Sequence, residues 1–172
     1  MAGPDLDAWL PEPLLCTRHH RGADAPDDEI WAAAQAIRVR DTRTLGRLVR
    51  WRIPGTPTAV TYGELFRSPP FTVLAEGDGC LVSGLVGRIW TLERDYPRLD
   101  GAEEFRAWDK PGNAKVLFAH WVDDGTLHSQ ARVAGTDRRA SLRLRALWAV
   151  VGPFERLIGG EALSLAVRRA DG

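Results

Sequence analysis

The last part of the chain, residues 137–172, constrains the fold most, because its apolar residues recur at helical spacing over a long run. Arginines mostly occupy the opposite side of this predicted helix. Positions i, i+3, i+4 and i+7 of one face are Leu144, Leu147, Trp148 and Val151. Gly152-Pro153 interrupts the pattern, since proline removes a helical donor and clashes with the preceding turn. We therefore predict either one kinked helix or two helices that meet at this joint.

Two hairpins are predicted in the middle of the chain. Their turns are Gly77-Asp78-Gly79 and Asp123-Asp124-Gly125, which have the composition of tight β-turns. The flanking strands are predicted at 71–76, 80–90, 114–122 and 126–134. An amphipathic helix and a set of antiparallel strands can bury their apolar surfaces against each other.

The alternation of residues along these strands predicts which face is covered. In 114–122 one face holds Val116, Phe118, His120 and Val122. In 126–134 one face holds Leu127, Ser129, Ala131 and Val133, while His128, Gln130 and Arg132 point away. We expect one covered face and one face in water. Both faces of 80–90 are similarly apolar, so the pattern leaves the orientation of that strand open.

The remaining segments complete an α+β architecture. Residues 1–13 are acidic and proline-rich and are expected to form a loose arm in which Trp9 and Leu10 alone can dock. A first strand is predicted at 14–23, and a helix with Pro26 in its first turn follows it. Shorter helices or helical turns are predicted at 42–51, at 61–66 and near 102–108, the last within an irregular segment at 91–112. The predicted order is a curved antiparallel sheet wrapped around a long C-terminal helix, with two short helices after the first strand.

Length and composition fit one domain. The chain has 172 residues, and its 23 Lys and Arg residues balance 23 Asp and Glu residues, so nothing in its charge favours a nucleic-acid partner. No uncharged run of 18 residues is present, and we expect no membrane insertion. No export signal is visible and the two cysteines, Cys16 and Cys80, form no CxxC pair. A cytoplasmic location is therefore expected, with both cysteines as small core residues.

The segment 38–52 is unusually basic. It holds six arginines against Asp41 alone, whereas residues 1–31 hold seven acids against two arginines. The two segments could compensate each other across the surface, which is the simpler interpretation. An anion-binding or protein-binding patch on 38–52 is the alternative.

The order of elements, together with four stretches, resembles the SRPBCC superfamily of START-like, polyketide-cyclase-like proteins with the helix-grip fold. The matching stretches are DAPDDEIWAAA at 24–34, GLVGRIW at 84–90, KPGNAKVLFAHWV at 110–122 and ARVAGTDRRASLRLRALWAVVGPFERLI at 131–158. The resemblance covers about residues 14–170 and is greatest to a group of small bacterial members without a known ligand. It implies one helix-grip domain over 14–172, with a hollow between sheet and helix.

This resemblance implies binding of a hydrophobic or amphipathic small molecule in that hollow. The residues that we expect to line it are Trp90, Phe118, His120, Trp148 and Arg88. His120 departs from the family, in which related strands have an aromatic or aliphatic residue at this position. Two alternatives stay open. One is a cyclase- or aromatase-like enzyme in which His120 or Arg88 steers a polar group of a polyketide-like substrate, and the other is a protein-interaction module that uses 38–52 and has a collapsed interior.

A metal site is not expected. Cys16, His19 and His20 are close in sequence, but neighbouring residues of a strand point to opposite faces, so both histidines cannot join the cysteine at one tetrahedral site. The serines and the glycine-rich pieces lack the context of a nucleophile elbow or a phosphate loop. We therefore expect no catalytic residue of a known signature and no cofactor, and the sequence leaves the oligomeric state open.

Overall fold

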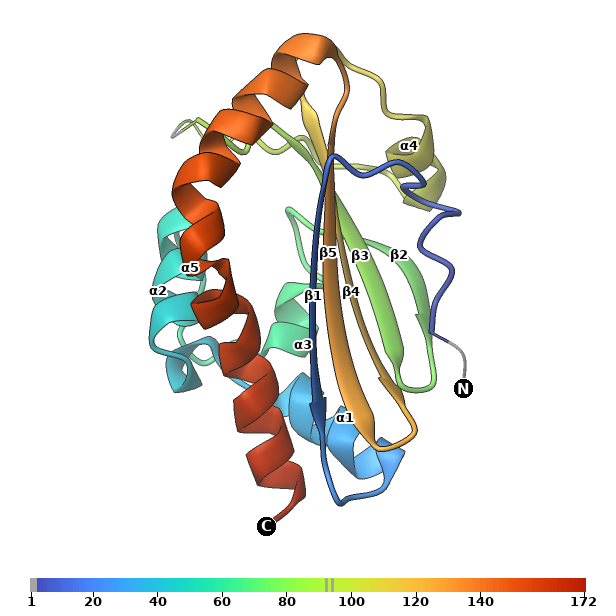
Figure 1. Cartoon of the computed structure of the whole chain (residues 1–172), viewed down its shortest axis with the longest axis vertical. Coiled ribbons are helices and arrows are strands. Elements are labelled where there is room, and N and C mark those ends of the chain that lie inside the picture. The colour runs from blue at the N-terminus through green and yellow to red at the C-terminus, as the bar shows by residue number, and fades with distance from the viewer. Residues whose placement is uncertain (1–2, 92, 94) are drawn as a thin grey trace.

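A five-stranded antiparallel sheet faces a long C-terminal helix (Figure 1). The structure is a computed structural model of the chain that describes residues 3–91, 93 and 95–172, without the side chains of 151 and 153–159. The strands are β1 (Leu15–Gly22), β2 (Thr72–Gly77), β3 (Cys80–Gly87), β4 (Ala114–Asp123) and β5 (Thr126–Gly135). The helices are α1 (Asp27–Ala36), the 3-10 helix η1 (Val39–Asp41), α2 (Thr44–Arg52), α3 (Tyr62–Leu65), α4 (Ala102–Ala107) and α5 (Arg138–Ala170). The fold is α+β with helix-grip architecture, as predicted.

The sheet has the strand order β1-β5-β4-β3-β2, and both predicted hairpins are present. In the β4–β5 turn, Asp124 and Gly125 have φ angles of 48° and 69°. Two successive positive φ values are typical of the tight turn whose twist matches that of the flanking strands. The order of the strands makes β1 an edge strand, which explains why Cys16 is exposed although a core position was expected.

The inner face of the sheet, which faces α5, is the one that alternation predicted. Its residues on β4 and β5 include Val116, Phe118, His120, Leu127, Ser129, Ala131 and Val133. The register resolves β3, since Leu85 pairs with Val116 and lies on this face, while Val82 and Val86 are buried on the other. The two faces of β3 are similarly apolar because both are covered.

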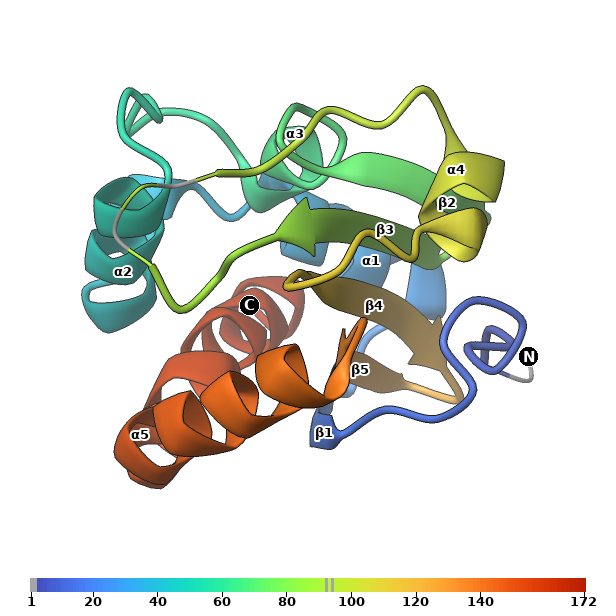
Figure 2. The same cartoon turned by 90° about the horizontal axis from the view of Figure 1, so that it is seen from above.

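The outer face of the sheet is covered, which corrects the expectation of a wet face. Helix α4 and residues 3–13 lie on the side of the sheet opposite to α5 (Figures 1 and 2). Phe105 of α4 is 0% exposed, and Leu6 and Leu10 are 4% and 5% exposed. All three belong to one cluster of buried residues with Val82 and Leu117. The wet face was predicted from polar residues of β5, but the same face of β4 and β3 is apolar and needs this cover.

Residues 3–13 are docked, where a loose arm was expected. Arg132 Nη1 of β5 donates to the Asp7 carboxylate at 2.5 Å and to the Leu10 carbonyl at 2.9 Å. Arg132 is itself 9% exposed, so its buried guanidinium gains partners from this segment. Leu6, which the sequence did not single out, is one of the two buried leucines that anchor it.

Helix α5 continues from Arg138 to Ala170 through the predicted joint at Gly152-Pro153, so the alternative of two helices is wrong. The Asp137 carboxylate caps its first turn by accepting from the Ala140 amide at 2.7 Å and also accepts from the Gly112 amide. The helix contacts α1, α2, β1 and β5 along its length. Packing of this kind supplies most of the stability of a helix in a protein and offsets one missing backbone hydrogen bond.

Candidate ligand-binding cavity

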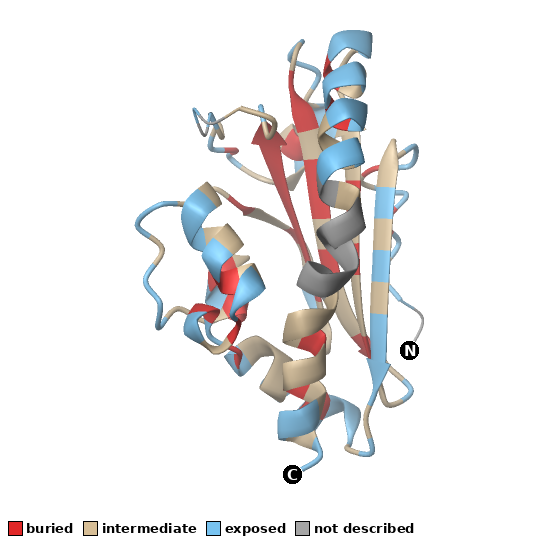
Figure 3. Cartoon of the chain, turned by 60° about the vertical axis from the view of Figure 1, so that its left-hand side comes forward, coloured by how far each residue is buried: buried red, intermediate tan, exposed pale blue. Residues whose placement is uncertain are grey.

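A cavity of about 530 Å³ lies between the inner face of the sheet and α5, with α2 and α3 closing its sides. This volume is within the range of ligand pockets. The walls are mainly apolar and come from elements far apart in the chain. They include Leu85 and Val116 from the sheet, Leu45, Leu48 and Val49 from α2, Leu65 of α3 and Phe66 directly after it, and Leu144, Leu147 and Leu163 from α5. Figure 3 shows that much of β3 and β4 behind this wall is buried, whereas the edge strand β1 is half-buried or exposed.

Four of the five residues that the sequence proposed lie in the cavity wall. Trp90, Phe118, His120 and Trp148 all line it. Whether they bind a ligand stays a prediction. The structure therefore brings together a loop residue, two strand residues and a helix residue that are up to 58 positions apart in the chain.

Arg88 does not line the cavity, which corrects the fifth expectation. It is exposed, and its Nε lies 3.7 Å from the Asp95 carboxylate. The cause is Gly87, where β3 ends with a φ of 142°, a conformation that side chains with a Cβ rarely adopt. A Cβ at this position would also collide with the Asp95 carbonyl. The strand alternation stops here, so Trp90 turns to the cavity while Arg88 turns to solvent.

His120 is a half-buried titratable residue of β4 that faces the cavity. Its ring packs against Phe66, with the ring centroids 4.8 Å apart, and its Nε2 is buried without a hydrogen-bond partner among the described residues. Burial disfavours the charged imidazolium and lowers the pKa of His120 to about 4. The side chain is therefore a neutral imidazole at physiological pH, able to accept or donate a hydrogen bond according to its tautomer.

A second polar region surrounds Arg52, which the sequence analysis counted only as part of the basic segment 38–52. Arg52 lines the cavity, and its guanidinium donates to the carbonyls of Thr91 at 2.9 Å and Ile89 at 3.0 Å and contacts the Tyr96 hydroxyl. Trp90 lies in the same region, and its Nε1 is buried without a partner among the described residues. Sequence reasoning missed Arg52 because it follows a run of exposed arginines on α2, at the last residue of the helix.

Helix α2 is held to α5 by Glu161. The Glu161 carboxylate accepts from the backbone amides of Arg43 at 2.6 Å, Thr44 at 3.1 Å and Leu45 at 2.9 Å, at the beginning of α2. The first amides of a helix lack partners within the helix, and a carboxylate there also interacts favourably with the helix dipole. One side chain of α5 therefore fixes the helix that closes this side of the cavity.

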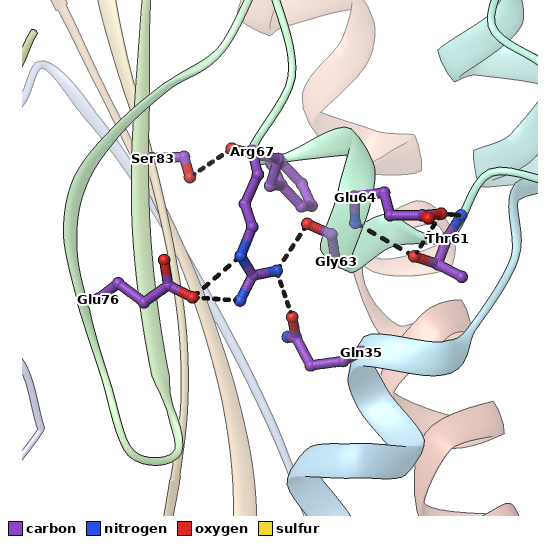
Figure 4. A network of polar contacts seen from close by, with 8 residues as sticks. Gln35, Thr61, Gly63, Glu64, Arg67, Glu76 and Ser83 are labelled. Carbon is purple, nitrogen blue, oxygen red and sulfur yellow. Dashed lines mark hydrogen bonds and ion pairs between the residues drawn. The ribbon is translucent and has the colours of Figure 1, made fainter.

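Arg67 fixes the opposite side, next to α3 (Figure 4). Its guanidinium donates to Glu76 of β2, to the Gln35 side chain of α1 at 2.6 Å and to the Gly63 carbonyl of α3 at 2.7 Å. A capping box between Thr61 and Glu64 starts α3. These contacts join α1, α3 and β2 around the wall that contains Phe66.

The described residues contain neither a metal-binding cluster nor a membrane-spanning helix. They contain no group of three or more His, Cys, Asp or Glu side chains placed to hold a metal ion. Among the helices of the described part of the chain, none combines the length and the apolarity needed to cross a membrane.

Comparison with known proteins finds no matching family model and no matching curated protein. Among solved structures, the chain is similar to the di-domain ARO/CYC BexL from the BE-7585A biosynthetic pathway, with 12% identity and a TM-score of 0.37 over 95% of this chain. The chain spans about half of BexL, 53% of its length.

Two further structures are similar at the same low level. CalU16 from Micromonospora echinospora has 14% identity and a TM-score of 0.33, over 90% of this chain and 82% of CalU16. Ara h 8.0201 has 11% identity and a TM-score of 0.24, over 87% of this chain and 98% of that one. Likenesses this weak carry no functional argument, and the helix-grip description follows from the arrangement of the sheet and α5.

Proposed function

We propose that the protein binds a hydrophobic or amphipathic small molecule in the cavity between the sheet and α5. The observation that carries this proposal is the cavity of about 530 Å³ with its mainly apolar wall. A hollow of this size forfeits the dispersion contacts that a packed core would make, and an apolar ligand restores them. Trp90, Phe118, His120 and Trp148 are the proposed contact residues, and membership of the SRPBCC superfamily is proposed on the sequence resemblance.

The two alternatives make different demands on the same region. A cyclase- or aromatase-like enzyme would use His120, the neutral imidazole in the wall, and would convert a polyketide-like substrate with measurable turnover. An interaction module built on 38–52 requires a filled interior, whereas the structure has a hollow there and turns Arg52 into it. The binding protein is therefore the function that the geometry supports best.

The test is identification and displacement of a bound molecule. Native mass spectrometry of the purified protein, followed by denaturing extraction, is expected to detect an apolar compound at close to one per chain. The apolar fluorophore 1-anilinonaphthalene is expected to bind the emptied protein and to be displaced by that compound.

A cavity-filling variant separates the cavity from the surface. Ala131 lines the cavity and Ala146 is exposed on α5. Ala131→Phe is expected to weaken fluorophore binding several-fold by occupying part of the hollow, and Ala146→Phe to leave it unchanged. Equal affinities in the two variants, or an empty protein that binds no fluorophore, would contradict the proposal.

A further inference from the structure

Three polar side chains form a row across the inner face of the sheet. Ser129 of β5 pairs with His19 of β1 on one side and with His120 of β4 on the other. All three line the cavity. Since neighbouring strands lie about 4.8 Å apart, the row spans about 10 Å and crosses the cavity floor perpendicular to the strands.

The residues on both sides of this polar row are mostly apolar. On β4 and β5, the next pair of residues on the same face is Phe118 with Ala131 in one direction along the strands. In the other direction it is Val122 with Leu127. On β4 and β5 the row is therefore a narrow polar band between apolar residues, and on β1 Thr17 adds a hydroxyl two residues from His19. A molecule lying along the strands meets this band at one position only, and the rest of its length contacts apolar side chains.

His120 has an unused hydrogen-bonding atom that a ligand could satisfy. Its Nε2 lacks a hydrogen-bond partner among the described residues, and a buried polar atom in this state is uncommon in native structures. The ring packs against Phe66 and both side chains line the cavity. The Cβ–Cγ torsion of a histidine is broad, so a modest turn of the ring presents the nitrogen to an occupant.

The imidazole is neutral, because burial lowers the pKa of His120 to about 4. A neutral ring can hydrogen-bond a hydroxyl but offers no countercharge to a carboxylate, which would lose its hydration on entering. The Ser129 hydroxyl, opposite in the register, can serve as the second partner of the same hydroxyl group.

We propose that the polar row of His19, Ser129 and His120 selects a ligand with one uncharged hydroxyl group, an alcohol or a phenol, on an apolar body. This inference rests on the proposed ligand-binding function and adds the orientation of the ligand. The hydroxyl lies at the polar row, and the apolar body extends along β4 and β5 toward Trp148. His120 is the main specificity-determining residue, and Ser129 is the second.

The test compares three probes of one shape: 2-naphthol, naphthalene and 2-naphthoate. Their dissociation constants for the full chain are measured by calorimetry or tryptophan fluorescence. The wild-type protein is expected to bind 2-naphthol about tenfold more tightly than naphthalene, the selectivity of one buried hydrogen bond, and more tightly than 2-naphthoate.

Variants assign this preference to the polar row. His120→Phe is expected to keep naphthalene affinity and to reduce the preference for 2-naphthol to less than about twofold, and Ser129→Ala to reduce it in part. His20→Phe is the matched control, because His20 lies on β1 next to His19 but is exposed on the other face. It is expected to change none of the three constants.

A measurement on the wild-type protein covers the case in which His120→Phe does not fold. The ring-nitrogen NMR shift of His120 is expected to move on addition of 2-naphthol and to stay in place with naphthalene. Equal binding of 2-naphthol and naphthalene, or tighter binding of 2-naphthoate, would overturn the inference and leave the proposed function standing. Binding of none of the three probes would count against both.

Discussion

The two faces of one sheet are closed in opposite ways. On the outer face, Phe105, Leu6 and Leu10 fill the space against β3 and β4, and the ring of Phe105 occupies the place that Gly84 leaves open. On the inner face, α5 contacts mainly β1 and β5 of the sheet, and a hollow of about 530 Å³ remains that residues of β1, β5, β4 and β3 line. Both faces are largely apolar, so the strands alone do not determine which side is hollow.

The difference lies in what covers each face. The short helix α4 and the extended segment 3–13 can each follow the local shape of the outer face, so their side chains pack closely against it. A long helix cannot follow a twisted sheet along its whole length, and the contacts of α5 with the sheet are concentrated on β1 and β5. The outer face therefore contributes close packing to the fold, while the inner face leaves a hollow.

Truncation of one phenylalanine on each face tests this division most strongly. Phe105→Ala is expected to lower the free energy of unfolding by about 3–5 kcal/mol, as for a large side chain removed from a filled core. Phe118→Ala is expected to cost about 1–2 kcal/mol, because its ring already borders a hollow and makes fewer contacts. Urea unfolding of both variants measures the two values. A cost for Phe118→Ala equal to that of Phe105→Ala would show that the inner face is packed after all.

Acid is expected to destabilise the inner face through His120. Its pKa is about 4 in the folded protein and about 6.5 when unfolded, so the unfolded chain binds more protons between these values. The contribution of neutral His120 to the free energy of unfolding is fully present above pH 6.5. It is lost as the pH falls toward 4 and amounts to about 3 kcal/mol. Urea unfolding of the wild type and of His120→Phe across this range measures the difference.

Other titrating groups can be distinguished from His120 in this experiment. The pKa of His128 on the outer face is also lowered, chiefly by burial, and its contribution has the same sign but is present in both proteins. The carboxyls of Asp41, Glu64 and Asp137 have lowered pKa values. Their contribution to the free energy of unfolding is therefore lost only at more acidic pH. Parallel pH curves for the wild type and His120→Phe would rule out the assignment to His120.

Alternation along strands predicted the inner face of the sheet well, because Phe118, His120 and Ser129 lie in long strands with regular register. It failed beyond the end of β3 at Gly87. Alternation would place Arg88 and Trp90 on one face, but it no longer applies after the strand has ended. It also failed for Leu6, since a leucine among prolines and acids carries no periodic signal. The polar row could be predicted only in part, because it depends on how β1 pairs with β5 across more than 100 residues.

Added volume is expected to have opposite consequences on the two faces. A Cβ at Gly84 would lie 2.6 Å from Cε2 of Phe105, so Gly84→Ala overfills the outer face and is expected to cost about 1–3 kcal/mol. Ala131→Val extends into the hollow and is expected to change the free energy of unfolding by less than about 0.5 kcal/mol. Thermal and urea unfolding of both variants test this, and equal losses would contradict the presence of free volume on the inner face.

The smallest expected effect concerns how each cover is attached. Glu161→Gln removes the charge that Glu161 places at the beginning of α2, and is expected to lower global stability by only about 0.5–1 kcal/mol. Glu104→Gln is the matched control on the outer face, since Glu104 accepts from the Asp100 amide near α4, whose Phe105 is buried.

Native-state hydrogen exchange is expected to become several-fold faster in α2 of Glu161→Gln, and to stay slow in α4 of Glu104→Gln. Because α2 forms one wall of the cavity, release of 1-anilinonaphthalene from Glu161→Gln is expected to become faster as α2 opens more often. Unchanged exchange in α2 would mean that its apolar contacts with α5, and not Glu161, keep this wall of the cavity closed.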